Sequence, residues 1–205
     1  IDTAKREVHL GDEVIAYDQL ALTTGSSANT LPAAIGGALD GVYTVRTLGD
    51  VDAMASEFSA GKRALIVGGG YIGLEAAAVA RKLGVDVTLV EMSERILQRV
   101  AAPATSDYFR ALHQSHGVEI LEGIGLERLT GETRVNGAKL SNGKEIEVDF
   151  VIVGVGITPN ASLAVQAGLT VENGILVDAQ GRTSDPNVWS AGDCASFELR
   201  GAHRR

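Results

Sequence analysis

The sequence predicts an α/β fold built on a parallel sheet, and three observations support this class. An apolar run at 63–67 leads into a glycine-rich turn, a helical pattern and a second strand pattern that ends at Glu91. A later apolar run at 150–156 ends in glycines, as a buried parallel strand does. Between them, two Asn-Gly pairs separate short stretches, which is typical of β-hairpins. We therefore expect a parallel sheet with helices plus a three-stranded β-meander.

The residues before the first apolar run predict short strands and one helix. Strands are expected at 6–10, 14–17 and 18–25, and a loop at 26–32. Asp50 is predicted to be the N-cap of a helix that runs to about Ser59.

The segment 63–91 is the centre of the prediction. Its strand leads into Gly68-Gly69-Gly70-Tyr71-Ile72-Gly73, a helix at 74–83 and a second strand at 85–91. In such a turn the first glycine permits the tight bend, the second lets a pyrophosphate approach the backbone, and the third lets helix and strand pack closely. The helix N-terminus offers free N–H groups and a partial positive charge to the phosphates. This order is the Rossmann fingerprint of dinucleotide binding.

The acid at the end of the second strand completes this fingerprint. Glu91 lies 18 residues after Gly73, close to the roughly 20 expected of an acid that binds the adenosine ribose. Its carboxylate predicts NADH in preference to NADPH, because a 2′-phosphate would meet a like charge. The alternative is a glycine-rich turn in an unrelated α/β domain.

The residues after Glu91 are predicted to form helices and short strands. Helices are expected at 103–116 and 162–167, and strands at 118–121, near 134–135, at 138–140, 145–147, 150–156 and 175–178. Asn136-Gly137 and Asn142-Gly143 are predicted to be the two hairpin turns of the meander. The run 188–193 is the last segment from which we draw a structural prediction.

Composition and charge argue against several classes of function. The net charge of −8 argues against nucleic acid as a partner. No apolar run reaches the 18 residues that a membrane helix needs. Cys194 is the single cysteine, which excludes an internal disulfide and favours a reducing, cytoplasmic compartment. The four histidines have no metal-ligand spacing, so no metal is expected.

Four motifs, in order, resemble those of FAD-dependent flavoproteins of the pyridine nucleotide-disulphide oxidoreductase superfamily. They are the stretch 17–25 ending in Thr24-Gly25, the glycine fingerprint, Gly154–Asn160, and Ser190–Ala195. Thr23 replaces the usual alanine of the first motif. The stretch Val45-Arg46-Thr47-Leu48 resembles most the branch of NADH-dependent ferredoxin reductases, whose members serve putidaredoxin and aromatic-ring dioxygenases.

This resemblance implies a Rossmann-like NAD-binding domain inserted in an incomplete FAD-binding domain. It assigns 1–43 to part of the FAD domain, 44–164 to the NAD domain and 165–205 to the return into the FAD domain. The strand–glycine–helix unit for the FAD diphosphate and a C-terminal interface domain have no counterpart in these residues. The chain starts at Ile1 and ends without a clear stop, so we expect a piece of a longer protein that is inactive alone.

The resemblance also implies which residues hold the cofactors. The NAD residues are Gly68, Gly69, Gly70, Tyr71, Ile72, Gly73, Glu91, Gly156 and Ile157, and the FAD residues are Thr24, Gly25, Arg46, Gly192 and Asp193. Glu75 is the implied catalytic residue, beside the nicotinamide and the flavin and paired with a lysine elsewhere in the protein.

Each of these assignments has a structural alternative. The alternative for Glu75 is a solvated acid near a helix N-terminus. The alternative for Tyr71 and Ile72 is ordinary packing at the start of a helix. Arg46 is also a surface arginine, and Asp193 also forms an Asx turn. Likewise, Arg95 and Arg99 after the second strand are either phosphate contacts or surface charge.

The implied activity is electron transfer from NADH through FAD to a [2Fe–2S] ferredoxin or rubredoxin-like protein that feeds an oxygenase. The cofactors carry this chemistry, and the residues show no nucleophile or strong general base. One alternative is a pyridine nucleotide–disulfide reductase or an NADH oxidase or peroxidase on the same scaffold. A second is a non-enzymatic NAD-binding module that senses redox state.

Overall fold

The computed structural model describes residues 1–199 and 202–204. The chain forms two compact units: unit 1 contains residues 1–27 and 157–205, and unit 2 contains residues 28–156. Each unit has its own hydrophobic core, and each is described separately below.

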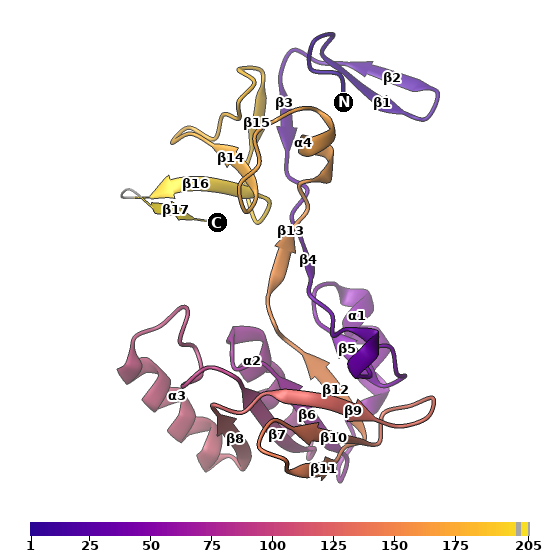
Figure 1. Ribbon diagram of the computed structural model, residues 1–205, viewed down its shortest axis with the longest axis vertical. Coiled ribbons are helices and arrows are strands. Elements are labelled where there is room, and N and C mark those ends of the chain that lie inside the picture. The colour runs from indigo at the N-terminus through magenta and orange to yellow at the C-terminus, as the bar shows by residue number, and fades with distance from the viewer. Residues whose placement is uncertain (200–201, 205) are drawn as a thin grey trace. The chain divides into compact units, whose positions relative to one another are not determined.

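Unit 2 is built on a five-stranded parallel sheet in the order β5-β12-β6-β7-β8 (Figure 1). Its strands are β5 (Val42–Thr44), β6 (Arg63–Val67), β7 (Asp86–Glu91), β8 (Val118–Glu122) and β12 (Phe150–Val153). Neighbouring strands pair in parallel throughout. Leu65 and Ile66 on β6 are fully buried and point to opposite faces, so the central strand is apolar on both sides. The predicted parallel sheet and its central strands are confirmed.

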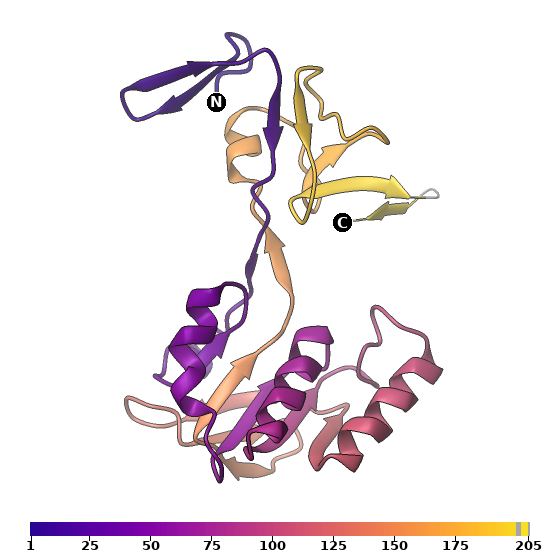
Figure 2. The same cartoon turned by 180° about the vertical axis from the view of Figure 1, so that it is seen from behind.

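Helices cover one face of this sheet. They are α1 (Leu48–Met54), η2 (Ala55–Glu57), α2 (Tyr71–Lys82) and α3 (Pro103–Ser115), and Figure 2 shows α2 and α3 lying across the strands. Met54 of α1, Leu74 and Ala77 of α2, and Ile66 and Ile152 of the sheet share one buried cluster. The small side chains of α2 allow the helix backbone to approach the sheet closely.

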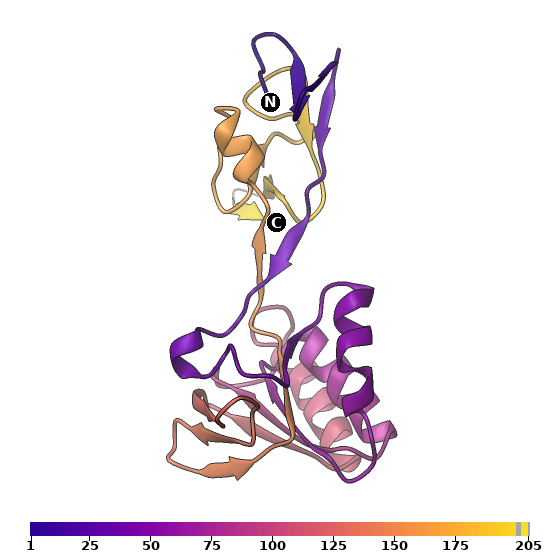
Figure 3. The same cartoon turned by 90° about the vertical axis from the view of Figure 1, so that its right-hand side faces the viewer.

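The β-meander covers the opposite face. Its strands are β9 (Leu126–Thr130), β10 (Gly137–Leu140) and β11 (Glu145–Glu147), and η1 (Ala33–Ile35) lies on the same side. Figure 3 shows the sheet between the helices and the meander. Leu129, Ala138 and Leu140 pack against Leu65 and Val151 in a second cluster. The sheet is therefore covered on both faces, as a parallel sheet requires.

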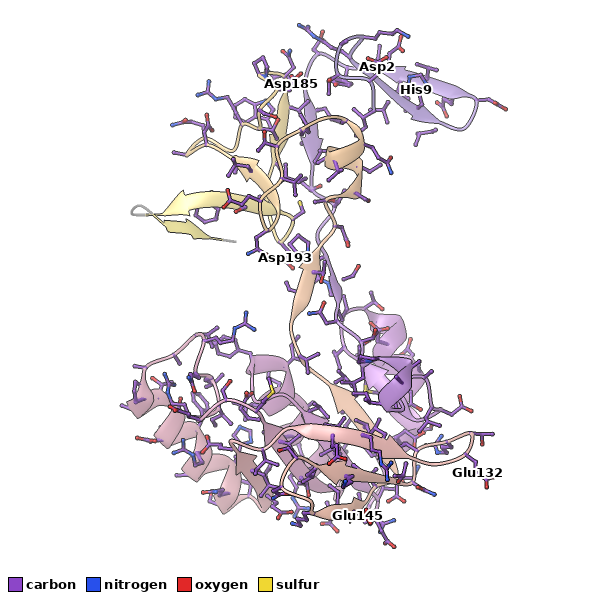
Figure 4. The ribbon with its side chains drawn as sticks, viewed as in Figure 1. Asp2, His9, Glu132, Glu145, Asp185 and Asp193 are labelled. Carbon is purple, nitrogen blue, oxygen red and sulfur yellow. The ribbon has the colours of Figure 1, made fainter. Side chains whose placement is uncertain are left out.

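One of the two predicted hairpin turns is wrong. Asn142-Gly143 does turn the chain, with Gly143 at φ +83 and its N–H bonded to the Leu140 carbonyl. Gly137, however, already belongs to β10, and the preceding connection runs from Gly131 to Asn136, with Glu132 at its tip (Figure 4). The predicted strand at 134–135 is absent because β9 occupies that place in the meander.

Both helix starts differ from the prediction. The N-cap of α1 is Thr47, whose Oγ1 accepts from Asp50 N–H, while Asp50 is the N3 residue whose carboxylate accepts from Thr47 N–H at 2.7 Å. This reciprocal pair is a capping box, which the sequence prediction misread by taking the acid for the cap. α2 begins at Tyr71, directly after its N-cap Gly70, so its first turn contains Gly73, the last glycine of the fingerprint.

Unit 1 consists of short strands and one helix. Its elements are β1 (Glu7–Leu10), β2 (Glu13–Ala16), β3 (Leu20–Leu22), α4 (Ser162–Gln166), β14 (Ile175–Val177), β15 (Val188–Ser190), β16 (Ala195–Leu199) and β17 (Ala202–Arg204). β1 and β2, near the predicted strands 6–10 and 14–17, form an antiparallel hairpin. β3 pairs in parallel with β15, and β14 pairs in parallel with β16. Leu22, Ile175, Val188 and Cys194 form its core. β16 and β17 were not predicted.

The expected loop at 26–32 contains a strand. β4 (Ser26–Ala28) pairs with β13 (Ile157–Pro159), and both lie where the chain passes between the two units. Their partners are far apart in sequence, so no local pattern announces this pairing. Unit 2 begins at Ala28, and Leu31, Leu39 and Val42 pack on its meander-side core.

Candidate functional site

The glycine loop between β6 and α2 is fixed by close backbone contacts. Gly68 has φ +110, and a Cβ there would lie 2.3 Å from the carbonyl oxygen of Gly154. A Cβ on Gly73 would lie 2.1 Å from the Gly68 carbonyl oxygen. Both distances exclude any side chain, so these glycines bring the loop against the ends of β6 and β12. The roles predicted for Gly68 and Gly73 as turn and packing residues match this geometry.

Gly70 differs from these two glycines because nothing lies near the position of its missing side chain. No heavy atom comes within 4 Å of a Cβ built there. Gly70 is the N-cap of α2, and no side chain caps that end of the helix. The first-turn N–H groups, with the positive end of the helix dipole, are thus the natural donors for an anion. This open approach fits a cofactor diphosphate.

Glu91 is bound directly to the glycine loop. Its Oε2 accepts from the Gly69 N–H at 2.7 Å, and its Oε1 accepts from the Ser93 N–H at 2.7 Å. A carboxylate offers about four acceptor positions, so each oxygen keeps one for a further donor such as a ribose hydroxyl. The structure therefore brings together the fingerprint glycines and the acid that the sequence predicted from spacing alone.

The exposed residues of α2 lie next to this loop. Tyr71 is 57% exposed and Ile72 is 40% exposed, so neither is ordinary core packing. Glu75 is also exposed, one turn further along the helix. Gly156 has φ +99, and its carbonyl accepts from Asn29 N–H at 3.0 Å, while Ile157 begins β13.

A second cluster, in unit 1, contains four of the five residues expected on the FAD side. Thr24 Oγ1 donates to the Asn160 carbonyl at 2.5 Å, and Asn160 returns two bonds, from Nδ2 to the Thr24 carbonyl and from N–H to the Gly25 carbonyl. Asp193 Oδ2 accepts from the buried Ser26 hydroxyl at 2.9 Å. Asp193 itself is exposed, on the segment between β15 and β16 (Figure 4).

Ser26 and Asn160 were not among the predicted site residues. Asn160 was part of a quoted motif, so its polar side chain after Pro159 could have flagged it. Ser26 gave no signal, because its partner Asp193 is 167 positions away. Both side chains hold predicted cofactor residues in place.

Arg46 and Cys194 differ in their surroundings from the two groups of residues described above. Arg46 is exposed and lies in unit 2, where its N–H donates to Asp50 Oδ2 at 3.0 Å. Cys194 is buried, with its thiol 3.4 Å from the carbonyl oxygens of Leu22 and Ala191. Burial raises the pKa of this thiol, but hydrogen bonds from Ser190, Thr24 and Gly25 outweigh burial and lower the pKa overall.

No group of three or more His, Cys, Asp or Glu side chains within residues 1–199 and 202–204 is arranged to hold a metal ion. In the same part of the chain, none of the helices combines the length and apolar content needed to cross a bilayer.

The chain is similar in sequence to known reductases. A ferredoxin–NAD(P)+ reductase from Sphingomonas sp. is 44% identical over 198 residues, covering 96% of this chain and 48% of that protein. Putidaredoxin reductase from Pseudomonas putida is 39% identical over 203 residues, covering 96% and 48%. The chain thus spans about half the length of these relatives.

Solved structures of reductases are also similar to this chain. The ferredoxin reductase of Rhodopseudomonas palustris superposes with a TM-score of 0.93 at 37% identity, covering 100% of this chain and 52% of that chain. Putidaredoxin reductase in its covalent complex with putidaredoxin superposes with a TM-score of 0.92 at 37% identity, covering 98% and 49%. The model of the family described as pyridine nucleotide-disulphide oxidoreductase matches residues 1–204. With this match, and with the glycine loop and acid in place, the chain belongs to the pyridine nucleotide-disulphide oxidoreductase family.

Proposed function

We propose that this chain is part of an NADH-dependent flavoprotein reductase that passes electrons through FAD to a small iron–sulfur protein. The observation that carries the proposal is the joined unit of glycine loop and acid. Gly70 leaves the helix N-terminus open to a diphosphate, and Glu91 is held on the same loop with acceptor positions to spare. The first contact would bind the diphosphate of any dinucleotide, and the second would favour one with a free 2′-hydroxyl.

The chain's residues would bind and orient NADH. The N–H groups of the first turn of α2 would hold the pyrophosphate, and Glu91 would accept from the adenosine ribose. Tyr71 and Ile72 are exposed beside the loop, where they would cover the nicotinamide end. Gly156, Ile157 and Glu75 are proposed to line the same site, with Glu75 nearest the reacting atoms. Bound NADH supplies a hydride.

Unit 1 would hold part of the FAD. Thr24 and Gly25 are fixed by Asn160, and the Asp193 carboxylate is fixed by Ser26, so this surface is preorganised for ribityl hydroxyls. Gly192 and Arg46 complete the proposed contacts. FAD supplies the conversion of a two-electron hydride into single electrons. We accordingly assign 44–164 to the NAD domain and the two flanking segments, 1–43 and 165–205, to the FAD domain.

The electron acceptor is proposed from the relatives. Relatives that cover nearly all of this chain are named for ferredoxin or putidaredoxin reduction. The acceptor would be a [2Fe–2S] ferredoxin or a rubredoxin-like protein that feeds an oxygenase. Nucleic acid and membrane are not proposed as partners. A cytoplasmic location is proposed from the single cysteine, which is buried.

A second candidate function has support from structural neighbours of lower identity. An NAD-dependent persulfide reductase from A. fulgidus has a TM-score of 0.90 at 28% identity, covering 100% of this chain and 39% of that chain. A water-forming NADH oxidase from Lactobacillus brevis has a TM-score of 0.81 at 26% identity, covering 96% and 45%. A disulfide, peroxide or oxygen reductase on this scaffold is therefore the alternative, and a non-enzymatic NAD sensor is a third.

Steady-state kinetics of the full-length protein separate these candidates. A ferredoxin reductase reduces a cognate ferredoxin with NADH, followed through the iron–sulfur absorbance. Fast turnover of a disulfide, peroxide or oxygen with ferredoxin left oxidised supports the alternative enzyme class. A sensor shows almost no turnover with any acceptor, including artificial ones.

A further inference from the structure

The segment between β7 and α3, residues 92–102, joins the acid of the proposed nucleotide site to the helix layer. Ile96 and Leu97 are buried in the helix-side core, and Leu97 N–H donates to the Gly69 carbonyl at 2.9 Å. Leu97 has φ +56, a conformation that residues with a side chain rarely adopt. Hydrogen bonds within the segment and to α3 can help to hold this conformation.

Arg95 makes those contacts. Its Nη1 donates to Ser106 Oγ at 2.5 Å, and its Nη2 donates to the carbonyl oxygens of Ala101 at 3.0 Å and Gln98 at 3.3 Å. We name this arrangement the Arg95 clasp. A planar guanidinium with several donors suits such a set of acceptors, which a lysine ammonium would not match.

The clasp is tied to the interior through Ser106. This residue is fully buried on α3, and its hydroxyl donates to the Ile96 carbonyl at 2.6 Å. The Ile96 N–H in turn donates to Glu122 Oε1 at 2.7 Å, and Glu122 is paired with Arg110. The segment that carries Ser93, the second partner of Glu91, is thus fixed to α3 and β8.

We propose that Arg95 is a positioning residue that sets the preference of the site for NADH over NADPH. By holding the 92–102 segment, the clasp keeps the Ser93 and Gly69 N–H groups where they orient the Glu91 carboxylate. The clasp also uses the Arg95 guanidinium as donor to a hydroxyl and two carbonyl groups of its own chain. This cation is therefore not available to pair with the 2′-phosphate of NADPH. The inference rests on the proposed function, because it concerns the same nucleotide site.

Two arginines of the same segment allow a matched test. Arg95→Met opens the clasp, whereas Arg99→Met removes the same charge from an exposed side chain four positions along. Dissociation constants of NADH and NADPH are measured by calorimetry on the 205-residue chain. For Arg95→Met we expect NADH to bind roughly three- to tenfold more weakly, because the Glu91 carboxylate remains but is less well oriented toward the ribose. NADPH should change by less than about twofold, because it does not use the oriented carboxylate. Arg99→Met should leave the ratio of the two constants unchanged.

Amide hydrogen exchange without nucleotide supplies an independent readout. Arg95→Met should lower the protection of the Gly69 and Ser93 amides, and Arg99→Met should not. Equal effects of the two variants on the binding ratio, or a loss of stability in Arg95→Met with the ratio and both amides unchanged, would overturn the inference while leaving NADH binding intact. If the unmodified chain binds neither nucleotide, the proposed function fails and this inference fails with it.

Discussion

The Glu91 carboxylate accepts a hydrogen bond from the Gly69 backbone N–H at 2.7 Å. This bond joins the end of β7 to the turn that precedes α2, two segments that a linear motif lists as separate features. The acid cannot be removed without also releasing a backbone donor of the glycine loop. In the proposed NADH site, the groups that would bind the ribose and the phosphates are therefore joined in one unit.

NADH is expected to bind this chain more tightly than NADPH, and Glu91→Ala should narrow the gap. Loss of a charged acceptor costs about 1.5–3 kcal/mol per bond, so NADH should weaken by roughly 10- to 100-fold. Binding of NADPH should weaken less, because the substitution also removes the repulsion between the Glu91 carboxylate and the 2′-phosphate. Calorimetry with both nucleotides measures this, and Glu94→Ala, which removes an exposed acid nearby, is the control. Equal affinity for both nucleotides in the unmodified chain contradicts the prediction.

Two glycine substitutions should separate folding from binding. Gly73→Ala places a Cβ 2.1 Å from a backbone oxygen and should destabilise unit 2 by about 1–3 kcal/mol, since the backbone must shift. Gly70→Ala places a Cβ in open space at φ −82, so stability should fall by less than about 1 kcal/mol. NADH binding to Gly70→Ala should weaken by at least roughly tenfold, because the methyl group blocks the diphosphate. Chemical denaturation measures the stability of the two variants, and calorimetry measures their binding of NADH. If Gly70→Ala binds NADH as tightly as the unmodified chain, the diphosphate does not bind at Gly70.

Unit 2 should lose stability in acid through Glu57. This carboxylate is 5% exposed and accepts from Lys62, Arg134 and Tyr43. Burial raises its pKa, but these three hydrogen bonds outweigh burial and hold the pKa below its ordinary value. A lowered folded-state pKa stabilises the protein above the unfolded value of about 4.3, and this contribution disappears as pH falls through the folded pKa. Asp149, whose pKa is lowered chiefly by its bond from Arg63, adds to the same trend.

Glu57→Gln tests the origin of that acid sensitivity. The variant should be about 1–3 kcal/mol less stable at neutral pH, because a buried charged bond is lost. Its stability should then decline less than that of the unmodified chain between about pH 6 and about pH 3.5. Hydrogen exchange of β6 and β12 amides follows unit 2 specifically. Glu127→Gln, which removes an exposed partner of Lys139, is the control, and parallel pH curves for all three chains would rule out the assigned role of Glu57.

The 205-residue chain should purify with little or no FAD. It contains a single G-x-G-x-x-G motif, which we assign to the proposed NAD site. These 205 residues therefore offer no second glycine loop with its helix dipole for the FAD diphosphate. Asp193 and Thr24 would then contact only the uncharged part of the flavin cofactor. The visible absorbance spectrum measures the content directly, and near one FAD per chain would refute the expectation.

Local sequence patterns were sufficient to predict the elements whose residue types are restricted by burial or by backbone geometry. The apolar runs of β6 and β12, the small-residue helix α2 and the acid at the end of β7 could be read from sequence because burial and backbone geometry restrict residue type at each position. The Asn142-Gly143 turn was readable for the same reason. The choice of Thr47 over Asp50 as N-cap was not, because both residues of a capping box are good caps by composition.

Tertiary structure alone decided what depends on partners far along the chain. The sequence was sufficient to predict that residues 63–91 form a strand, a glycine turn, a helix and a second strand that ends in an acid. It did not determine that β4 pairs with β13, that Ser26 holds Asp193, or that Arg95 closes on Ser106 instead of remaining a surface charge. A hydrogen bond between side chains has no sequence period, and its partner is chosen only when the packed core brings the two together.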